Sequence, residues 1–256
     1  MKPGGANVVV NRLISVGTPL LLLVAWELAA RAHAIDTRFF SSPTRIFAQF
    51  WLMLADGELL YHTLATVTRI LIGFVIGTTI GIVLGLAIGL IPTVAAALEP
   101  LVDATFPIPK VGLLPLVIIL FGIGEASKYA IIAISVVYLV IINTAAGVRQ
   151  IERIYLDVGR NYHAGRLMMF TDVALPGALP SIVIGMKVSM GVSLIVIVTA
   201  ESLAAKSGIG FLIWTSWQVF EVEKMYVGLL MTAILGFASS VMLDWAERRL
   251  IPWKQP

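Results

Sequence analysis

The residues capable of chemistry in this chain do not form a catalytic pattern. Its three histidines, His33, His62 and His163, lie on different segments and lack the spacing of a zinc-binding HExxH helix. The sequence has no cysteine, no G-x-x-x-x-G-K-[ST] phosphate loop and no G-x-S-x-G nucleophile turn. We therefore expect no enzyme activity, metal or cofactor in this chain. Any energy from ATP must be supplied by a partner.

The most polar stretch covers residues 149–172. It holds four arginines, one glutamate, two aspartates and one histidine, and the segment 175–180 (Leu-Pro-Gly-Ala-Leu-Pro) follows it. The apolar runs on both sides are each long enough to cross a bilayer. We therefore interpret 149–176 as a loop that one side of a membrane presents to a soluble partner, with a short helix over 156–166 and an apolar turn over 167–170. The alternative is an ordinary solvated loop.

A few charged residues lie inside apolar runs, where an ionisable group is a functional candidate by default. Lys110 follows Pro107 and Pro109, and prolines bend membrane helices. We assign Lys110, Pro107, Pro109 and Glu201 to a candidate translocation path. The alternatives are that Lys110 snorkels or caps carbonyls freed at a kink, and that Glu201 forms structural hydrogen bonds. Lys187 is expected to snorkel to the interface.

The composition indicates a membrane protein. Of the 256 residues, 59% are hydrophobic and only 13% are charged, whereas soluble domains carry about 25% charged residues. Backbone groups in hydrocarbon must pair internally, so the spans are helices and the fold class is all-α. The sequence predicts one membrane domain over 1–256, with six spans at 13–30, 68–90, 98–121, 129–148, 177–200 and 227–244. The first span has a rival interpretation, a signal peptide cleaved near Ala32-His33-Ala34.

Six spans place both termini on one side of the membrane, together with the arginines of 149–172. The positive-inside rule makes that side cytoplasmic and assigns Arg69 and Lys128 to the outer side. The small net charge of +3 therefore indicates orientation and not nucleic-acid binding. Ser42-Pro43 is typical of a helix start and predicts an amphipathic helix over 43–56 at the outer interface. The segment 207–226 predicts a second outer segment, either a short helix or a re-entrant piece.

A stripe of small residues runs through the second span. Five glycines recur every four residues: Gly73, Gly77, Gly81, Gly85 and Gly89. Such a stripe lets another helix approach closely. The partner can be a helix of the same chain, a second subunit or a moving surface.

The polar stretch resembles the EAA loop of ABC importer permeases. Residues 157–166 and 173–180 follow the pattern E-A-A, three residues, G-A, then V-x-L-P-x-A-L-P. Residues 42–44, 107–116, 121–128, 200–201 and 207–210 resemble the nitrate/sulfonate/taurine branch of the binding-protein-dependent permeases. Two departures are that Asp157-Val158-Gly159 replaces Glu-Ala-Ala and that His163 replaces the usual glycine.

This resemblance implies a type I importer permease with six transmembrane helices and a cytoplasmic coupling helix that lies in a groove of an ATPase. The residues expected to couple to the ATPase are Asp157, Gly159, Arg160, Tyr162, His163, Ala164, Gly165, Met168 and Pro176. The implied partners are a second permease copy, two cytoplasmic ABC ATPase subunits that bind ATP and Mg, an extracytoplasmic solute-binding protein and the lipid bilayer.

The resemblance further implies a multi-pass protein of the bacterial cytoplasmic membrane that imports a small solute, most simply an anion, by alternating access. Two copies of Lys110 facing a dimer axis would form a cationic constriction for such an anion. The alternative is a secondary transporter or channel that works without ATP. That class predicts an internal inverted repeat, and none is evident in the sequence.

Overall fold

The computed structural model describes residues 5–165 and 168–253, and every regular element within these ranges is a helix. The side chains of Arg153, Leu156 and Arg160, and those of most of the first half of α1, lie outside the description. The chain divides into two compact units, Met1–Leu60 with Leu212–Leu230 and Tyr61–Phe211 with Met231–Pro256. The helices are α1 (Gly5–Arg31), α2 (Pro43–Ala55), α3 (Glu58–Leu90), α4 (Pro92–Thr105), the 3₁₀ helix η1 (Lys110–Leu113), α5 (Leu114–Phe121), α6 (Glu125–Arg149), α7 (Arg153–Asn161), the π-helix η2 (Met169–Ala174), α9 (Leu175–Ala204), α10 (Ile209–Gln218) and α11 (Val222–Leu250).

In the first unit, α2 begins at Pro43, the position that the Ser42-Pro43 pair predicts. The Ser42 hydroxyl accepts a hydrogen bond from the Arg45 backbone N–H, which caps the helix. Glu27 of α1 accepts hydrogen bonds from the backbone and hydroxyl of Thr44. Phe47 and Trp51 stay exposed at 50% and 64%, so one face of α2 offers aromatic side chains to an interface.

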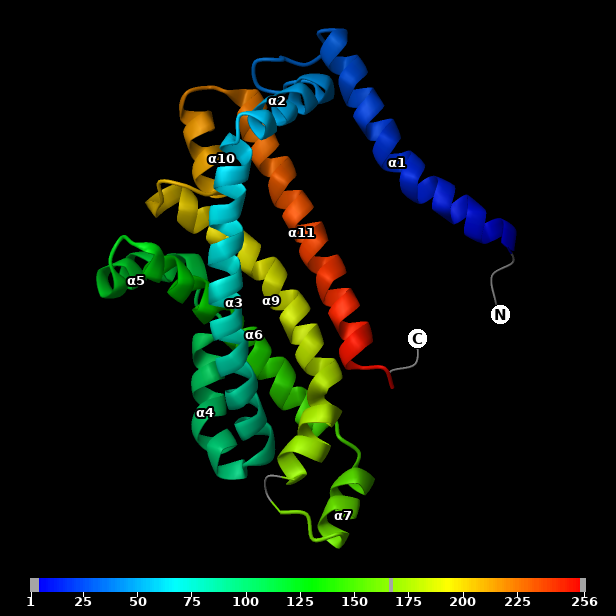
Figure 1. The fold of residues 1–256 in the computed structure, drawn as a ribbon, viewed down its shortest axis with the longest axis vertical. Helices are drawn as coiled ribbons and strands as arrows, with labels where there is room; N and C mark the ends of the chain where they lie inside the picture. The colour runs from blue at the N-terminus through cyan, green and yellow to red at the C-terminus, as the bar shows by residue number, and fades with distance from the viewer. Residues whose placement is uncertain (1–4, 166–167, 254–256) are drawn as a thin grey trace. The chain divides into compact units, whose positions relative to one another are not determined.

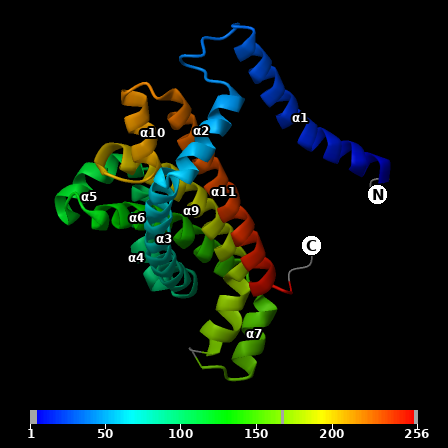
Figure 2. The same ribbon diagram turned by 45° about the horizontal axis from the view of Figure 1, so that its top comes forward.

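The second unit is organised around α3, α6 and α9. In Figures 1 and 2, α6 and α9 lie side by side along most of their length. Their contact is close because Gly147 of α6 faces Ser181 of α9, and Gly185 of α9 faces Asn143 of α6. An apolar core fills the space between the helices. Its buried members are Ile70, Phe74, Ile132, Val136, Val140, Met190, Leu194, Ile197 and Leu243.

The glycine stripe of α3 packs against α6 of the same chain. An added Cβ at Gly77 would lie 2.7 Å from the Ala133 carbonyl oxygen, and one at Gly81 would lie 2.7 Å from Val140 Cβ. The other three glycines meet α6 equally closely: Gly73 at Ile132, Gly85 at Thr144 and Gly89 at Val148. Close packing within the chain therefore accounts for the whole stripe.

Among the residues that the structure describes, four helical segments are long and apolar enough to span a membrane: Glu58–Leu90, Glu125–Arg149, Met169–Ala204 and Val222–Leu250. The predicted third span, 98–121, is not one straight helix. It divides into α4 and the η1–α5 pair, which are bent by 93° and count as a fifth span only if taken together. Prolines explain the break, because Pro107 and Pro109 remove backbone donors. The first predicted span lies within α1, and several side chains of this helix lie outside the description.

Lys187 is paired within the protein. Its ammonium pairs with Asp244 and with Glu247 of α11, the latter at 2.5 Å. A lysine on α9 therefore connects that helix to α11.

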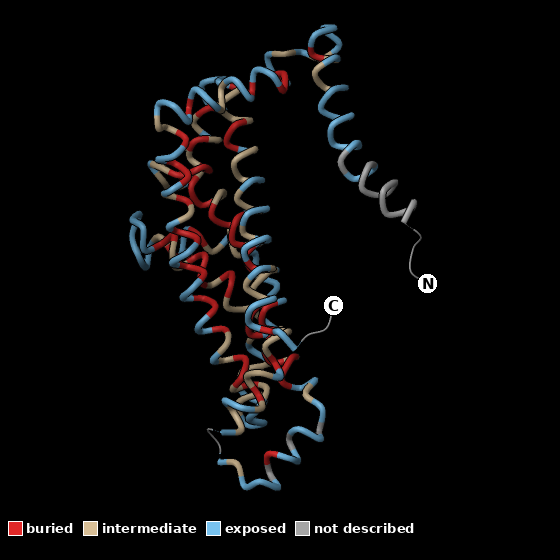
Figure 3. The backbone as a smooth tube through the Cα atoms, turned by 45° about the vertical axis from the view of Figure 1, so that its right-hand side comes forward, coloured by how far each residue is buried: buried red, intermediate tan, exposed pale blue. Residues whose placement is uncertain are grey.

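The segment between α6 and α9 carries α7, and Figure 3 shows that most of this part of the backbone is exposed. The short helix covers Arg153–Asn161 and not 156–166. It ends early because His163 takes a left-handed backbone conformation (φ 53°), and the Ala164 N–H then bonds to the Gly159 carbonyl at 2.9 Å. Arg166, also part of the polar stretch, lies outside the described residues. The expected apolar turn at 167–170 is partly the π-helix η2, which continues directly into α9.

Candidate functional site

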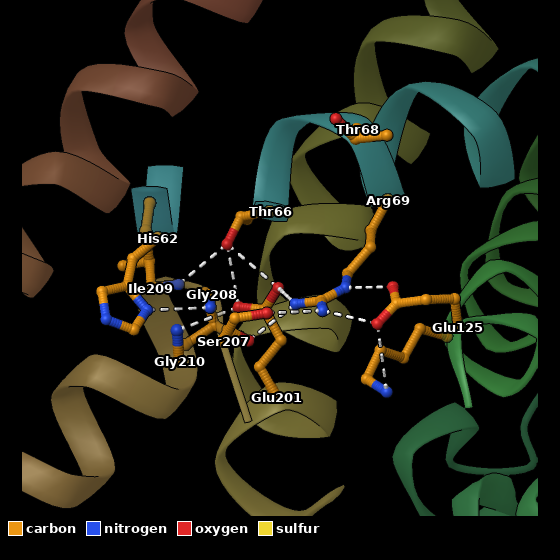
Figure 4. Close-up of polar contacts among 12 residues, drawn as sticks. His62, Thr66, Thr68, Arg69, Glu125, Glu201, Ser207, Gly208, Ile209 and Gly210 are labelled. Atoms are coloured by element: carbon orange, nitrogen blue, oxygen red, sulfur yellow. Dashed lines mark hydrogen bonds and ion pairs between the residues drawn. The ribbon is translucent and has the colours of Figure 1, made fainter. Parts of the chain in front are cut away.

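A buried polar junction joins α3, α6, α9 and the turn before α10 (Figure 4). Its centre is Arg69 of α3, whose side chain is 4% exposed. The guanidinium donates to both carboxylate oxygens of Glu125, at 2.6 and 2.7 Å, and to Glu201 Oε1 at 2.8 Å. It also donates to the carbonyl and hydroxyl oxygens of Ser207, at 2.7 and 2.9 Å. Arginine has five N–H donors, so its hydrogen-bonding capacity is used completely within the protein.

The second centre of the junction is Glu201, near the C-terminus of α9, whose side chain is fully buried. Its carboxylate accepts from Arg69, from the Thr66 hydroxyl at 2.9 Å and from the Gly210 backbone N–H at 3.0 Å. Thr66 in turn accepts from the Ile209 N–H at 2.8 Å, and His62 Nδ1 accepts from the Gly208 N–H at 3.0 Å.

The junction thus holds three successive backbone N–H groups at the start of α10, those of residues 208, 209 and 210. The first N–H groups of a helix lack partners within the helix and attract negative charge. Glu201 supplies that charge from a different helix, while α3 supplies the other two acceptors.

The turn can approach this closely only because two of its residues lack side chains. Gly208 has a φ of +112°, and a Cβ there would lie 2.2 Å from the Glu201 carboxylate carbon. At Gly210 a Cβ would lie 2.0 Å from the Val198 carbonyl oxygen. The two glycines of the Ser-Gly-Ile-Gly run at 207–210 therefore allow this turn to pack directly against the Glu201 carboxylate.

Charge is balanced within the junction. Lys128 donates to the Gly124 carbonyl at 3.0 Å and lies 3.8 Å from Glu125, so two cations face two carboxylates. Because Arg69 and Glu201 are buried and fully paired, they are fitted to hold helices together and not to bind a passing solute.

Lys110 lies at the bend between α4 and η1. Its ammonium donates to the carbonyl oxygens of Thr105, Phe106 and Ile108, at 3.3, 2.7 and 3.0 Å, and lies 4.2 Å from the centre of the Tyr138 ring. Lys110 therefore caps carbonyl groups at the bend, which is the alternative role that the sequence left open. No contact joins Lys110 to Glu201 in the described residues, so these two residues of the predicted path belong to different sites.

The predicted coupling residues lie on and after α7. Tyr162 is 84% exposed and Met168 is 54% exposed, while Gly159 is buried, and a Cβ there would lie 2.4 Å from Met169 Sδ. Asp157, His163 and Gly165 are exposed, and Ala164 and Pro176 are half-buried. The Arg160 side chain lies outside the description.

One face of α7 is apolar and borders an open groove of about 700 Å³. The groove is lined mainly by Tyr155, Val158, Tyr162, Met168, Val173 and Trp253. Exposed aromatic and apolar side chains next to a hollow are typical of a protein-binding surface. Of the predicted coupling residues, Gly159, Tyr162, Ala164, Met168 and Pro176 border this groove.

The polar junction was not predicted from the sequence. Arg69 was predicted at the outer end of the second span, and it lies inside α3 with Thr66 about one turn and His62 about two turns before it. A usable signal was present, because charges inside a membrane normally pair with one another. Arg69, Glu125 and Glu201 lie at the ends of three predicted spans and could have been paired on that basis.

The fold and site define a class of protein: a helical membrane component with a short, exposed helix between two spanning helices. Residues 62–252 match the family described as binding-protein-dependent transport system inner membrane component. The chain is 35% identical to SsuC of Escherichia coli (strain K12), whose name assigns it to aliphatic sulfonates transport, over 92% of this chain and 89% of SsuC. It is 31% identical to the taurine transport system permease protein TauC of the same organism, over 94% of this chain and 89% of TauC.

Among solved structures, an inward-facing conformation of the MetNI methionine ABC transporter matches with a TM-score of 0.62 at 17% identity, over 73% of this chain and 93% of that chain. This match concerns the fold alone. The chain belongs to the binding-protein-dependent permease family, as the sequence predicts. It is a multi-pass inner-membrane permease component of the sulfonate and taurine branch, and not an enzyme.

Proposed function

We propose that this chain is the permease subunit of an ATP-driven importer for a small sulfonate-type anion. The observation that carries the proposal is the exposed, amphipathic α7 within a chain that matches a permease family from residue 62 to residue 252. A short helix of this kind is not stable alone in water. It is stabilised when its apolar face is covered, and a cytoplasmic ATPase is the partner that the EAA-like pattern implies.

In this proposal the ATPase moves α7, and the permease changes between inward-open and outward-open states. ATP and Mg bind to two ATPase subunits and not to this chain. Nucleotide binding draws the two α7 helices of a permease dimer together. The permease is then the two-state element whose populations the nucleotide shifts.

The remaining partners follow from the same assignment. A second copy of this chain completes the central path, and a solute-binding protein delivers the solute on the outer side. The positive-inside rule places α7 and both termini in the cytoplasm.

The solute class rests on the names of SsuC and TauC, which refer to aliphatic sulfonates and to taurine. A sulfonate is a permanent anion, so its path favours cationic or dipolar groups. Two Lys110 side chains across a dimer axis would supply such groups if the ammonium leaves its carbonyl partners when the path opens.

The test is affinity purification in mild detergent, followed by identification of copurifying subunits and by uptake of a radiolabelled alkanesulfonate into proteoliposomes. We expect a P-loop ATPase to copurify, and uptake to require ATP and the binding protein. Tyr162→Ala should reduce copurification by about tenfold or more, because a buried interface tyrosine typically contributes at least 2 kcal/mol. The matched control is Phe237→Ala, which removes an aromatic side chain of α11 that is 74% exposed.

The alternative class predicts a different result. A channel or secondary transporter would take up solute without the ATPase, and Tyr162→Ala would leave uptake unchanged. Either of these outcomes overturns the proposed function.

A further inference from the structure

The polar junction and the candidate coupling loop lie at opposite ends of the same helix. Both belong to α9: the loop enters at Leu175, and Glu201 lies 26 residues later near the other end. At about 1.5 Å per residue, this separation is about 39 Å along the axis. A displacement at one end of α9 therefore moves the other end only if the helix and its neighbours move as a rigid body.

The packing between these ends is tight enough to make them one body. The five glycines of α3 place its backbone against α6, and Gly147 and Gly185 place α6 against α9. Contacts with no spare space resist sliding, because an interior is close-packed and switches between discrete arrangements. The three helices are thus coupled along their length, and α6 and α9 are the two helices that the loop directly joins.

At the far end, the junction extends this body to the start of α10. The guanidinium of Arg69, on α3, donates hydrogen bonds to α6 and to α9 and so connects the three helices. Glu201 and Thr66 accept hydrogen bonds from the Gly210 and Ile209 N–H groups. None of these partners is easily given up, because a buried carboxylate or guanidinium left unpaired is strongly unfavourable. The turn at 207–210 is accordingly fixed to the helices that carry the coupling loop.

We propose that the Arg69–Glu201 junction is a transmission joint, with Thr66 and Glu201 as positioning residues that make the start of α10 follow every displacement of α9. This inference rests on the proposed function, since it takes the displacement to originate where the ATPase binds α7. The joint gives the outer end of the permease a signal of the nucleotide state. In the reverse direction, it gives the ATPase a signal that the loaded binding protein has engaged the outer end.

The test uses two threonines of α3 that lie two residues apart. Thr66→Val removes the hydroxyl that bridges Glu201 and Ile209, whereas Thr68→Val removes only an intrahelical bond to the Leu64 carbonyl. Figure 4 shows Thr68 pointing away from the junction. Thr66→Ser is the conservative variant, because it keeps the bridging hydroxyl.

The measurement is ATP hydrolysis by the reconstituted permease–ATPase complex, with and without solute-loaded binding protein. We expect Thr66→Val to leave basal hydrolysis within about twofold of the natural protein but to reduce stimulation by the binding protein at least fivefold. Thr68→Val and Thr66→Ser should keep stimulation within about twofold. Glu201→Gln should lose stimulation more completely.

A second measurement reports the movement itself. The chain has no cysteine, so Lys206→Cys introduces a single thiol into this subunit, beside Ser207. The partner subunits are used in cysteine-free form, so that only this thiol reacts. We expect the modification rate of this thiol by a charged maleimide to change at least threefold when the ATPase is trapped with vanadate. In the Thr66→Val background the rate should stay the same in both states.

The proposal is overturned if Thr66→Val retains full stimulation, or if the Lys206→Cys rate in that background still follows the trapped state. It is also overturned if basal hydrolysis and stimulation fall together, because that pattern indicates a merely structural role. Should Glu201→Gln fail to accumulate, Thr66→Val carries the test, since it removes no charge. If the natural complex shows no ATPase at all, the proposed function fails first, and the two failures remain distinct.

Discussion

At the residue scale, Arg69 shows what a charge requires inside a packed helical unit. It is 4% exposed, and each of its N–H groups has an acceptor from Glu125, Glu201 or Ser207. Burying an ion pair costs desolvation energy, so such a pair adds little net stability over apolar residues. Removing Arg69 is different, because the fully buried Glu201 would lose its ion-pair partner.

Arg69→Leu should therefore be strongly destabilising, by about 3–5 kcal/mol, and should lower the midpoint of thermal unfolding in detergent. The matched control is Arg38→Leu. Arg38 donates to Asp36 and so holds the pKa of that carboxyl below its ordinary value, but its side chain is 84% exposed. We expect no measurable shift for the control. Equal unfolding midpoints for the two variants would contradict the role given to the junction.

At the element scale, the contact between α3 and α6 depends on the absence of side chains along one stripe. At Gly77 the obstacle is the Ala133 carbonyl oxygen, 2.7 Å from the position of an added Cβ. A backbone atom cannot rotate away, so one helix has to shift. Gly191 of α9 has no neighbour within 4 Å of an added Cβ.

Gly77→Ala and Gly191→Ala make a matched pair, because both gain the same helix propensity, about 1 kcal/mol. The difference between them isolates packing, and overpacking typically costs about 1–3 kcal/mol. We expect Gly77→Ala to unfold at a lower temperature than Gly191→Ala, with the latter equal to or above the natural protein. Identical midpoints would show that α3 and α6 are not in contact through the stripe.

The elements also show how far sequence reasoning reaches. The prolines near Lys110 predicted a bend, and the glycine period predicted a packed face, because both follow from local backbone geometry. The partner of the stripe could not be predicted, since a bare helix face fits many neighbours. The early end of α7 was missed because it depends on a left-handed backbone at His163, which non-glycine residues rarely adopt. The junction was missed because its members lie 56 and 132 residues from Arg69 and no short motif links them.

At the scale of the whole molecule, the placement of charge limits how an anion can cross. Arg69, Lys110, Lys128 and Lys187 each already hold carbonyl or carboxylate partners. Of these, Lys110 is the cation whose hydrogen-bond partners are all neutral. Replacing its partners with an anion therefore breaks no ion pair. Arg69 and Lys187 would have to leave carboxylates behind. In the proposed assembly of two copies, a pair of Lys110 side chains is therefore the most available of these cationic groups.

Lys110→Gln tests this placement in the assembled transporter. Glutamine keeps two N–H donors for the carbonyls at the bend but removes the charge. A charge-assisted hydrogen bond is worth about 1.5–3 kcal/mol, so uptake of an alkanesulfonate at low concentration should fall by about tenfold or more while assembly stays normal. Lys187→Gln is the control, because it removes a span cation held by two carboxylates and should lower stability without a selective loss of anion uptake. If Lys110→Gln leaves the uptake of every anion unchanged, Lys110 serves the bend alone and the solute passes without it.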